Sequence, residues 1–196
     1  MTGARKINLI SVPEYLAGEK VSTVKHEYIG GAVYAMVGAR NAHNAIASNA
    51  LGALWSNLKG QGCRPYNSDT KIRLRLPNET RFYYPDCSVV CKSNSPSDSF
   101  QDEPVIVIEV LSKSTRRTDE GEKRDAYLTI PSLFAYILIE QEQPAALVWR
   151  STERAFVREE LKGIDSIIDL SEIKTSLRLS DLYEGVEFAP EIDADD

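Results

Sequence analysis

The spacing of apolar residues along the chain predicts helices in four places. Between residues 41 and 58, apolar side chains recur at helical spacing over about four turns. Ser11, followed by a proline and a glutamate in a first turn, indicates the start of a shorter helix. Residues 119–129 also have a helical pattern, and residues 179–183 indicate a terminal helical turn.

Other segments follow the two-residue period of β-strands. Residues 26–37 contain two such runs around Gly30 and Gly31, which predicts a hairpin. Residues 105–111 form a nearly continuous apolar run, typical of a strand buried on both faces. Residues 71–76 alternate cleanly, so a half-buried strand is expected to present basic side chains on one face. Further strands are expected at residues 82–91, 133–139, 146–150 and 155–160.

Helix-like and strand-like segments are mixed along the whole chain, without repeats, low-complexity stretches or flexible linkers. The length of 196 residues suits one domain with a sizeable core. We therefore expect one mixed α/β (α+β) domain over residues 1–183, followed by an acidic tail over residues 184–196.

Composition favours a cytoplasmic protein that does not associate with membranes. No segment approaches the ~20 consecutive apolar residues of a membrane span, and no secretory signal is visible. The three cysteines are an odd and sparse set, which favours a reducing compartment over a disulfide framework. Cys87 and Cys91 lie on one predicted strand, about 13 Å apart and thus too far from each other to share one zinc ion. Both are expected in the core.

The net charge of −6 is unevenly distributed. Residues 1–76 contain ten Lys and Arg against four Asp and Glu, whereas residues 77–196 contain thirteen against twenty-five. Seven of these acids lie in residues 180–196, which contain no basic residue. Because the local field governs association with phosphate, the basic N-terminal half is compatible with a nucleic-acid partner.

Two carboxylates occupy positions within apolar stretches. Glu109 interrupts the run at residues 105–111, and Asp86 opens an apolar stretch on the expected neighbouring strand. A buried carboxylate is costly unless something compensates it, and a salt bridge at the strand end would do so for Glu109. Two such groups side by side would repel each other unless a cation lay between them. Mg²⁺ suits one or two carboxylates together with water and phosphate oxygens.

Lys123 belongs to an otherwise apolar helical stripe. It is followed at helical spacing by Ala126, Tyr127 and Ile130, so its side chain is expected on the side of the helix that faces the sheet. Its aliphatic stem could simply extend over the rim of the core. Alternatively, Lys123 belongs to one functional site together with Asp86 and Glu109.

Six motifs carry a resemblance to known proteins over roughly residues 13 to 183. The motifs are His26-Glu-Tyr-Ile-Gly-Gly, Gly38-Ala-Arg-Asn-Ala-His, Tyr84-Pro-Asp-Cys-Ser-Val-Val, Val107-Ile-Glu-Val-Leu-Ser-Lys-Ser-Thr, Glu122-Lys-Arg-Asp-Ala-Tyr and Ile130-Pro-Ser-Leu-Phe-Ala-Tyr-Ile-Leu-Ile. With its Asp, Glu and Lys, the chain resembles the PD-(D/E)xK nuclease superfamily and, more closely, the Uma-type family of restriction endonucleases.

The resemblance implies a restriction-endonuclease-like mixed β-sheet flanked by helices, and hydrolysis of DNA phosphodiester bonds that depends on Mg²⁺ or Mn²⁺. Asp86 and Glu109 would be the metal-binding carboxylates, with the carbonyl of Val110 as a further ligand. The superfamily's lysine usually lies two residues after the Glu, where this chain has Leu111. In the Uma-type family it has moved to the following helix, which makes Lys123 the catalytic lysine.

Five further residues have open roles. Glu27 matches a recurrent acidic position of the family and is either a metal ligand or base, or a charge at the edge of the hairpin. His43 either contacts phosphate near a helix N-terminus or is a surface or capping residue. Lys71, Arg73 and Arg75 either hold the nucleic-acid backbone or keep an exposed strand face in solvent.

By analogy with enzymes of this superfamily that cut both strands, a homodimer is expected. Two other functions stay open at this stage. One is a catalytically inactive nucleic-acid-binding domain that kept the fold. The other is an interaction domain whose acidic C-terminus binds a basic partner.

Overall fold

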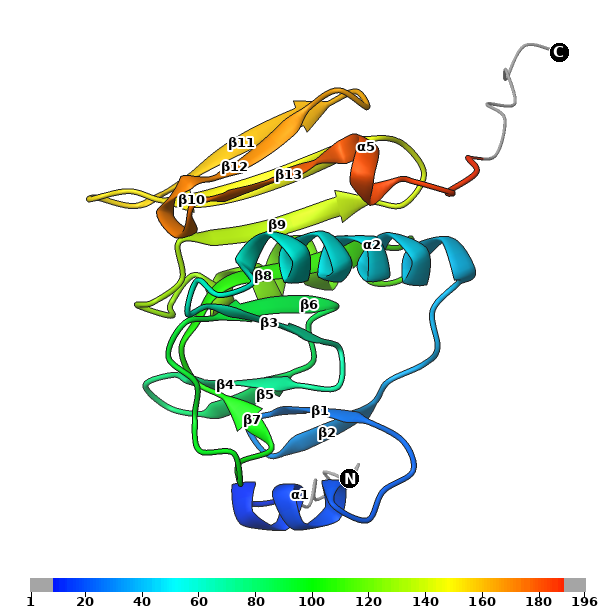
Figure 1. Cartoon of the computed structure of the whole chain (residues 1–196). Coiled ribbons are helices and arrows are strands. Elements are labelled where there is room, and N and C mark those ends of the chain that lie inside the picture. The colour runs from blue at the N-terminus through cyan, green and yellow to red at the C-terminus, as the bar shows by residue number, and fades with distance from the viewer. Residues whose placement is uncertain (1–8, 189–196) are drawn as a thin grey trace, which may run out of the picture.

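The computed structural model describes residues 9–188 of the chain (Figure 1). Of the acidic tail expected at residues 184–196, residues 189–196 lie outside the described part. The helices are α1 (Val12–Glu19), α2 (Asn41–Leu58), α3 (Arg116–Thr118), the π-helix η1 (Asp119–Lys123), α4 (Arg124–Tyr127), the 3₁₀ helix η2 (Ser171–Ile173) and α5 (Leu179–Leu182). Within residues 9–188, no helix is long and apolar enough to cross a membrane.

Most strands belong to two sheets. The five-stranded sheet contains, in spatial order, β2 (Ala32–Ala35), β1 (His26–Ile29), β5 (Thr80–Tyr83), β4 (Lys71–Arg75) and β7 (Phe100–Gln101). The six-stranded sheet contains β11 (Phe156–Lys162), β10 (Ala145–Ser151), β9 (Ala135–Glu140), β8 (Pro104–Leu111), β6 (Cys87–Val90) and β3 (Arg64–Asn67). A separate pair is formed by β12 (Ile167–Leu170) and β13 (Thr175–Arg178). Both large sheets are mixed, because β8–β9 and β4–β7 pair in parallel and the other neighbours pair antiparallel.

The two helices expected in the first third of the chain are confirmed. α1 begins with a capping box, in which the Ser11 hydroxyl accepts the N–H of Glu14 and the Ser11 N–H donates to the Glu14 carboxylate. α2 has the bounds that its apolar spacing predicts. Its stripe of Ile46, Ala50 and Leu54 is fully buried, which is the reason this segment is helical here.

The elements stack as layers (Figure 1). One face of the six-stranded sheet packs against α2, α5, β12 and β13. Its other face packs against α4 and against Ile72, Leu74 and Tyr83 of the five-stranded sheet. α1 covers the outer face of the five-stranded sheet, where Tyr15 packs on Tyr28. The expected mixed sheet flanked by helices is therefore confirmed, and the strand expected at residues 105–111 is β8, near the centre of the six-stranded sheet.

The single strand expected at residues 82–91 is wrong. This segment forms two strands in different sheets, because β5 ends at Tyr83 and β6 begins at Cys87. Pro85 lies between them, and proline has no N–H to continue a strand ladder. The chain crosses here from the five-stranded to the six-stranded sheet, which places Asp86 directly before β6.

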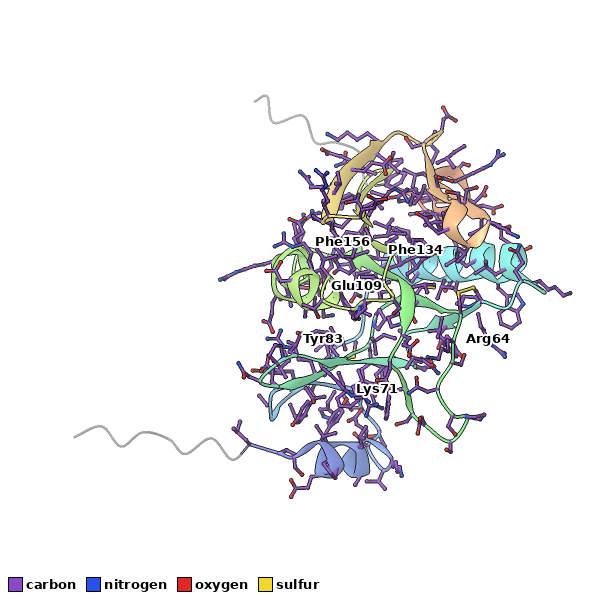
Figure 2. All side chains as sticks on the ribbon, turned by 90° about the vertical axis from the view of Figure 1, so that its left-hand side faces the viewer. Arg64, Lys71, Tyr83, Glu109, Phe134 and Phe156 are labelled. Carbon is purple, nitrogen blue, oxygen red and sulfur yellow. A yellow bond between two sulfur atoms is a disulfide. The ribbon has the colours of Figure 1, made fainter. Side chains whose placement is uncertain are left out.

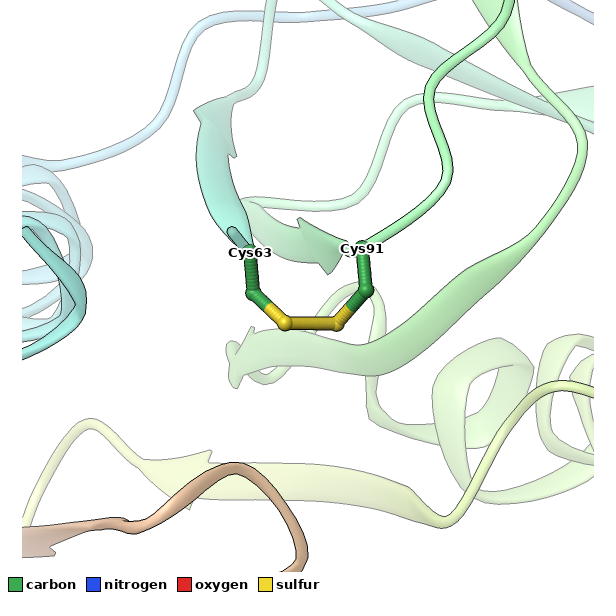
Figure 3. The surroundings of a disulfide bond; sticks show 2 residues. All are labelled: Cys63 and Cys91. Atoms are coloured by element: carbon green, nitrogen blue, oxygen red, sulfur yellow. A yellow bond between two sulfur atoms is a disulfide. The ribbon is translucent and has the colours of Figure 1, made fainter. Parts of the chain in front are cut away.

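The expectation of unpaired cysteines is also wrong. Cys63 and Cys91 form a disulfide bond (Figure 3), and Cys91 is exposed rather than in the core. Because β3 and β6 are antiparallel with Arg64 opposite Val90, the next pair along the ladder is Cys63 and Cys91. Cys87 is buried and free, as expected.

Candidate active site

Asp86 and Glu109 are direct neighbours on adjacent strands. Cys87 lies opposite Ile108 in the β6–β8 ladder, so the next pair is Asp86 and Glu109. The Asp86 N–H donates to Glu109 Oε2 at 3.3 Å, and the Val110 N–H donates to Asp86 Oδ2 at 2.7 Å. Figure 2 shows Glu109 between the two sheets. The structure thus brings together the two carboxylates that the sequence singled out.

Lys123 joins this pair from the π-helix. Its Nζ lies 2.8 Å from Glu27 Oε1, 3.4 Å from Glu109 Oε1 and 3.6 Å from Asp119 Oδ1. Glu27 comes from β1 of the five-stranded sheet, so it is an ion-pair partner of Lys123 and not a charge at the edge of the hairpin. The sheet-facing stripe predicted for Lys123, Ala126 and their neighbours is buried as expected.

The position two residues after Glu109 takes no part in this site. Leu111 is 1% exposed and packs in the core between the sheets. The lysine therefore reaches Glu109 from the helical segment that follows β8, as the family resemblance implied.

Burial and crowding shift the pKa values of these groups. Burial raises the pKa of Glu109 well above its ordinary value; Lys123 opposes this effect, and the charges of Asp119, Asp86 and Glu27 each add to it. Burial also raises the pKa of Asp119. For Lys123, burial lowers the pKa, but the charges of Glu109, Glu27 and Asp119 outweigh it and raise the pKa overall. Lys123 is therefore held as a cation among excess carboxylates.

His43 lies beside Asp86 rather than at the surface. The residue is 8% exposed, and its Nε2 lies 3.2 Å from Asp86 Oδ2. Burial lowers the pKa of His43, but hydrogen bonding and charge, chiefly from Asp86, outweigh it and raise the pKa overall. The interpretation of His43 as a surface residue is wrong, because the first turn of α2 points it at the start of β6.

A pocket of about 680 Å³ opens over these side chains. Its wall includes Asp86, Glu109, Asp119, Lys123 and His43. Most of the remaining wall is contributed by residues 23–25 and 36–40, by Asn44, by residues 110–116 after β8, and by residues 140–142 after β9. The carboxylates and the lysine thus share one solvent-connected space that a phosphate group could enter.

The basic strand does not belong to this pocket, and the expectation of an exposed basic face is wrong. Lys71 is 4% exposed, and its Nζ donates to the Tyr84 hydroxyl at 3.0 Å. Arg73 donates to Asp102 at 2.7 Å, so only Arg75 extends into solvent. None of the three lines the pocket, and Figure 2 shows Lys71 on the far side of the five-stranded sheet from Glu109.

Asp119 is the site residue that the sequence did not reveal. Its side chain is 3% exposed and faces Lys123. The available signal was its spacing, since a residue four positions before Lys123 lies on the same helical face. An acidic residue in the first turn of a helix is common, however, and this signal did not separate it from Glu120 or Glu122.

The mixed sheets, their flanking helices and the carboxylate–lysine cluster at the central strands define a restriction-endonuclease-like fold. The chain belongs to the Uma2 family, which is described as "Putative restriction endonuclease" and whose family model matches residues 12–180. This confirms the family that the sequence motifs indicated.

Individual proteins also resemble this chain in sequence or in fold. The Synechocystis protein slr1290 is 37% identical over 131 residues, which cover 66% of this chain and 68% of that protein. The Synechocystis protein sll1609 is 29% identical over 170 residues, which cover 85% of this chain and 95% of that protein. A crystal structure described as "a putative nuclease belonging to DUF820", from Anabaena variabilis, superposes with a TM-score of 0.69 at 20% identity. It covers 89% of this chain and 98% of its own, so the likeness of fold extends over nearly the whole molecule.

Proposed function

We propose that this protein is a nuclease of the PD-(D/E)xK type that hydrolyses DNA phosphodiester bonds with Mg²⁺ or Mn²⁺. One observation carries the proposal: Asp86 and Glu109 lie side by side with the Lys123 ammonium 3.4 Å from Glu109, in one pocket. The family description and the description of the Anabaena structure as a nuclease support the same reaction class.

The donor set fits a magnesium ion. Within residues 9–188, no group of three or more His, Cys, Asp or Glu side chains is arranged to hold a metal ion. Mg²⁺ does not need such a group, because it is usually bound through one or two carboxylates and keeps several waters. Asp86 and Glu109 supply two carboxylates, and a bound cation would favour the charged form of Glu109, whose pKa burial raises.

Each residue of the cluster then has a distinct role. Asp86 and Glu109 would hold Mg²⁺, which when bound would supply polarisation of the phosphate and a lowered pKa of water. Lys123 stabilises negative charge that develops on the phosphate during attack. Glu27 and Asp119 hold the Lys123 ammonium in position, and His43 fixes the orientation of Asp86.

The proposal is tested by incubating supercoiled DNA with the protein and Mg²⁺, Mn²⁺ or EDTA. Asp86→Asn and Glu109→Gln should abolish metal-dependent nicking. Lys123→Met should slow it roughly 10²–10³-fold, as expected for loss of one group that stabilises transition-state charge. Nicking should be absent in EDTA.

Asp165→Asn is the matched control, because Asp165 is an exposed carboxylate in the turn before β12 and lies outside the pocket. It should cleave like the wild type. Equal nicking by the wild type, Asp86→Asn and Glu109→Gln would reveal a contaminating nuclease and reject this site. DNA binding without cleavage by the wild type would favour an inactive nucleic-acid-binding domain.

A further inference from the structure

The N-terminus of α2 opens onto the pocket without a cap. Arg40 is the N-cap residue of this eighteen-residue helix, no side chain makes a capping hydrogen bond, and no acidic residue lies in the first turn. The first N–H groups of a helix have no partner within the helix, and the helix dipole adds partial positive charge there. Because Arg40, His43 and Asn44 line the pocket, this part of the wall attracts anions.

Arg40 differs from the other basic residues of the pocket wall in its ion pairing. Lys123 is surrounded by carboxylates, and the other basic side chains of the wall form ion pairs, namely Lys25 with Asp69, Lys113 with Glu142, and Arg116 with Glu140. Arg40 is exposed and forms no ion pair within residues 9–188. Its guanidinium is therefore available to a ligand.

His43 provides a second, independent sign of a missing ligand. It lies in the first turn of α2 and is more than nine-tenths buried, and its Nδ1 has no hydrogen-bond partner in the described structure. Buried polar atoms without a partner are rare, and each one needs an explanation. Since the other ring nitrogen of His43 contacts Asp86, this end of the pocket adjoins the catalytic carboxylates.

We propose that Arg40 and the first turn of α2 bind a second phosphate of the nucleic-acid strand, next to the phosphate that is cleaved at Asp86 and Glu109. The inference rests on the proposed function in taking nucleic acid as the ligand. Arginine side chains and helix N-termini contact phosphate oxygens without reading the bases. This subsite fixes where the strand lies along the pocket, and it contributes to affinity for every sequence.

The first test measures binding of a fluorescent DNA duplex by anisotropy at several salt concentrations, on a Glu109→Gln background that prevents cleavage. Arg40→Gln should weaken binding roughly tenfold, the usual effect of losing one charged hydrogen-bonding contact. It should also reduce the slope of log K against log salt by about 0.9, the value for one phosphate contact on duplex DNA. Arg154→Gln is the matched control, since Arg154 is exposed outside the pocket, and it should change neither quantity.

A methylphosphonate scan identifies the phosphate involved. Replacing phosphates one at a time with neutral methylphosphonates should weaken binding roughly tenfold at one position beside the cleaved bond. In the Arg40→Gln variant the same replacement should cost little, because the contact is already lost. Equal losses in both proteins at every position would overturn the inference.

Asn44→Asp separates binding from folding. It is nearly isosteric and places a carboxylate in the pocket near the start of α2, where the helix dipole favours negative charge. The melting temperature should stay equal or rise, while DNA affinity falls. Unchanged affinity would contradict an anion site at this helix end.

The inference and the proposed function can fail separately. Suppose that the wild type cleaves no DNA with any metal, but one methylphosphonate weakens DNA binding only when Arg40 is present. The nuclease proposal is then wrong and the subsite stands. If cleavage depends on Asp86 and Glu109 but Arg40→Gln binds DNA with unchanged affinity and salt slope, the subsite is wrong and the nuclease proposal stands.

Discussion

The ammonium group of Lys123 has carboxylate oxygens from three segments of the chain at 2.8 to 3.6 Å. Its side chain is only 9% exposed, so water compensates little of this charge. Removing one partner of a buried ionic cluster leaves the other charges without compensation, and this usually costs more than the cluster contributes. Lys123 is therefore structural as well as catalytic in the proposed site.

Lys123→Met should lower the free energy of unfolding by about 3–5 kcal/mol near neutral pH, because Glu27, Glu109 and Asp119 lose their common counter-charge. The loss should grow as pH rises. Burial already raises the pKa of Glu109 and Asp119, and without the lysine both rise further. A carboxyl with a raised folded pKa binds its proton more tightly in the folded state, so stability falls as pH rises above its unfolded pKa of about 4.

Urea unfolding of the two proteins in EDTA at acidic and alkaline pH measures this effect. Lys92→Met is the matched control, since the Lys92–Glu103 ion pair lies at the surface. It should change stability by no more than about 1 kcal/mol at either pH. A Lys123→Met variant with wild-type stability at both pH values would show that the carboxylates do not depend on this lysine.

Local sequence identified some of these residues and misjudged others for a common reason. Glu109, Asp86 and Lys123 stood out because each is a charge in an apolar pattern. The alternation of residues 71–76 predicts an exposed Lys71. Its side chain is buried instead, because its partner Tyr84 lies on another segment of the chain. Periodicity reports only on local sequence, so it cannot predict side-chain partners that tertiary folding brings together.

At the scale of elements, the π-helix η1 brings Lys123 and Asp119 into the site. Residues 116–127 run continuously from α3 through η1 to α4, and the wider π-turn lies between them. A π-turn acts like one extra residue inserted in an α-helix, and such turns are frequent at functional sites. Here the turn contains both Lys123, which contacts Glu109, and Asp119, which contacts Lys123.

Deleting Gly121 should convert this segment into a regular α-helix. Asp119 and Lys123 would then be three rather than four positions apart, and the Lys123 ammonium would shift relative to Glu109 by about 1.5 Å, the rise of one helical residue. Nicking activity should fall at least about 10²-fold, as expected for loss of an aligned charge. Circular dichroism should show that helix content is kept.

Gly121→Ala is the companion variant. Apart from the adjacent residues and the backbone of the helix itself, no atom lies within 4 Å of a Cβ added there. The backbone is helical, so alanine should keep the activity and raise stability by about 0.5–1 kcal/mol. Equal activity of the deletion variant and of Gly121→Ala would show that the π-turn has no role in placing Lys123.

The elements themselves were predictable to different degrees. The bounds of α2 and the central position of β8 follow from strong local periodicity. Residues 119–129 were expected to be helical, but nothing in their pattern distinguishes a π-turn from an α-turn. β3, β7, β12 and β13 were missed, since four residues or fewer carry too little alternation to mark a strand.

At the scale of the whole molecule, the disulfide closes a long part of the chain. Cys63 and Cys91 are 28 positions apart in the sequence, and the chain between them passes through both sheets. Constraining a loop of this length in the unfolded state corresponds to about 3–4 kcal/mol in the chain-entropy model. The bridge lies at the end of β6 away from Asp86, so it stabilises the sheet without contacting the site.

Reduction, or the double substitution Cys63→Ser with Cys91→Ser, should therefore lower the free energy of unfolding by about 3 kcal/mol and leave the activity of the folded protein unchanged. Urea unfolding with and without reductant measures the difference. The double variant should not respond to reductant. Thiol titration in denaturant should detect one thiol before reduction and three after it, since the chain has three cysteines; three before reduction would contradict the bridge.

Stability and function oppose each other at Glu109. Because burial raises the pKa of this carboxyl, the folded protein favours its neutral form, which glutamine imitates. Glu109→Gln should therefore be more stable than the wild type in EDTA at alkaline pH, and the difference should shrink as pH falls and Glu109 takes up its proton.

Magnesium should reverse that order. A ligand at 100 times its Kd stabilises a protein by about 2.7 kcal/mol, so Mg²⁺ should raise the melting temperature of the wild type and of the control Asp165→Asn. Glu109→Gln should gain little, because it lacks one of the two carboxylates that we propose as ligands of the ion. Thermal unfolding over a Mg²⁺ titration measures all three proteins. If Mg²⁺ stabilised Glu109→Gln as much as the wild type, the buried glutamate would not be a ligand, and its cost to folding would require a different explanation.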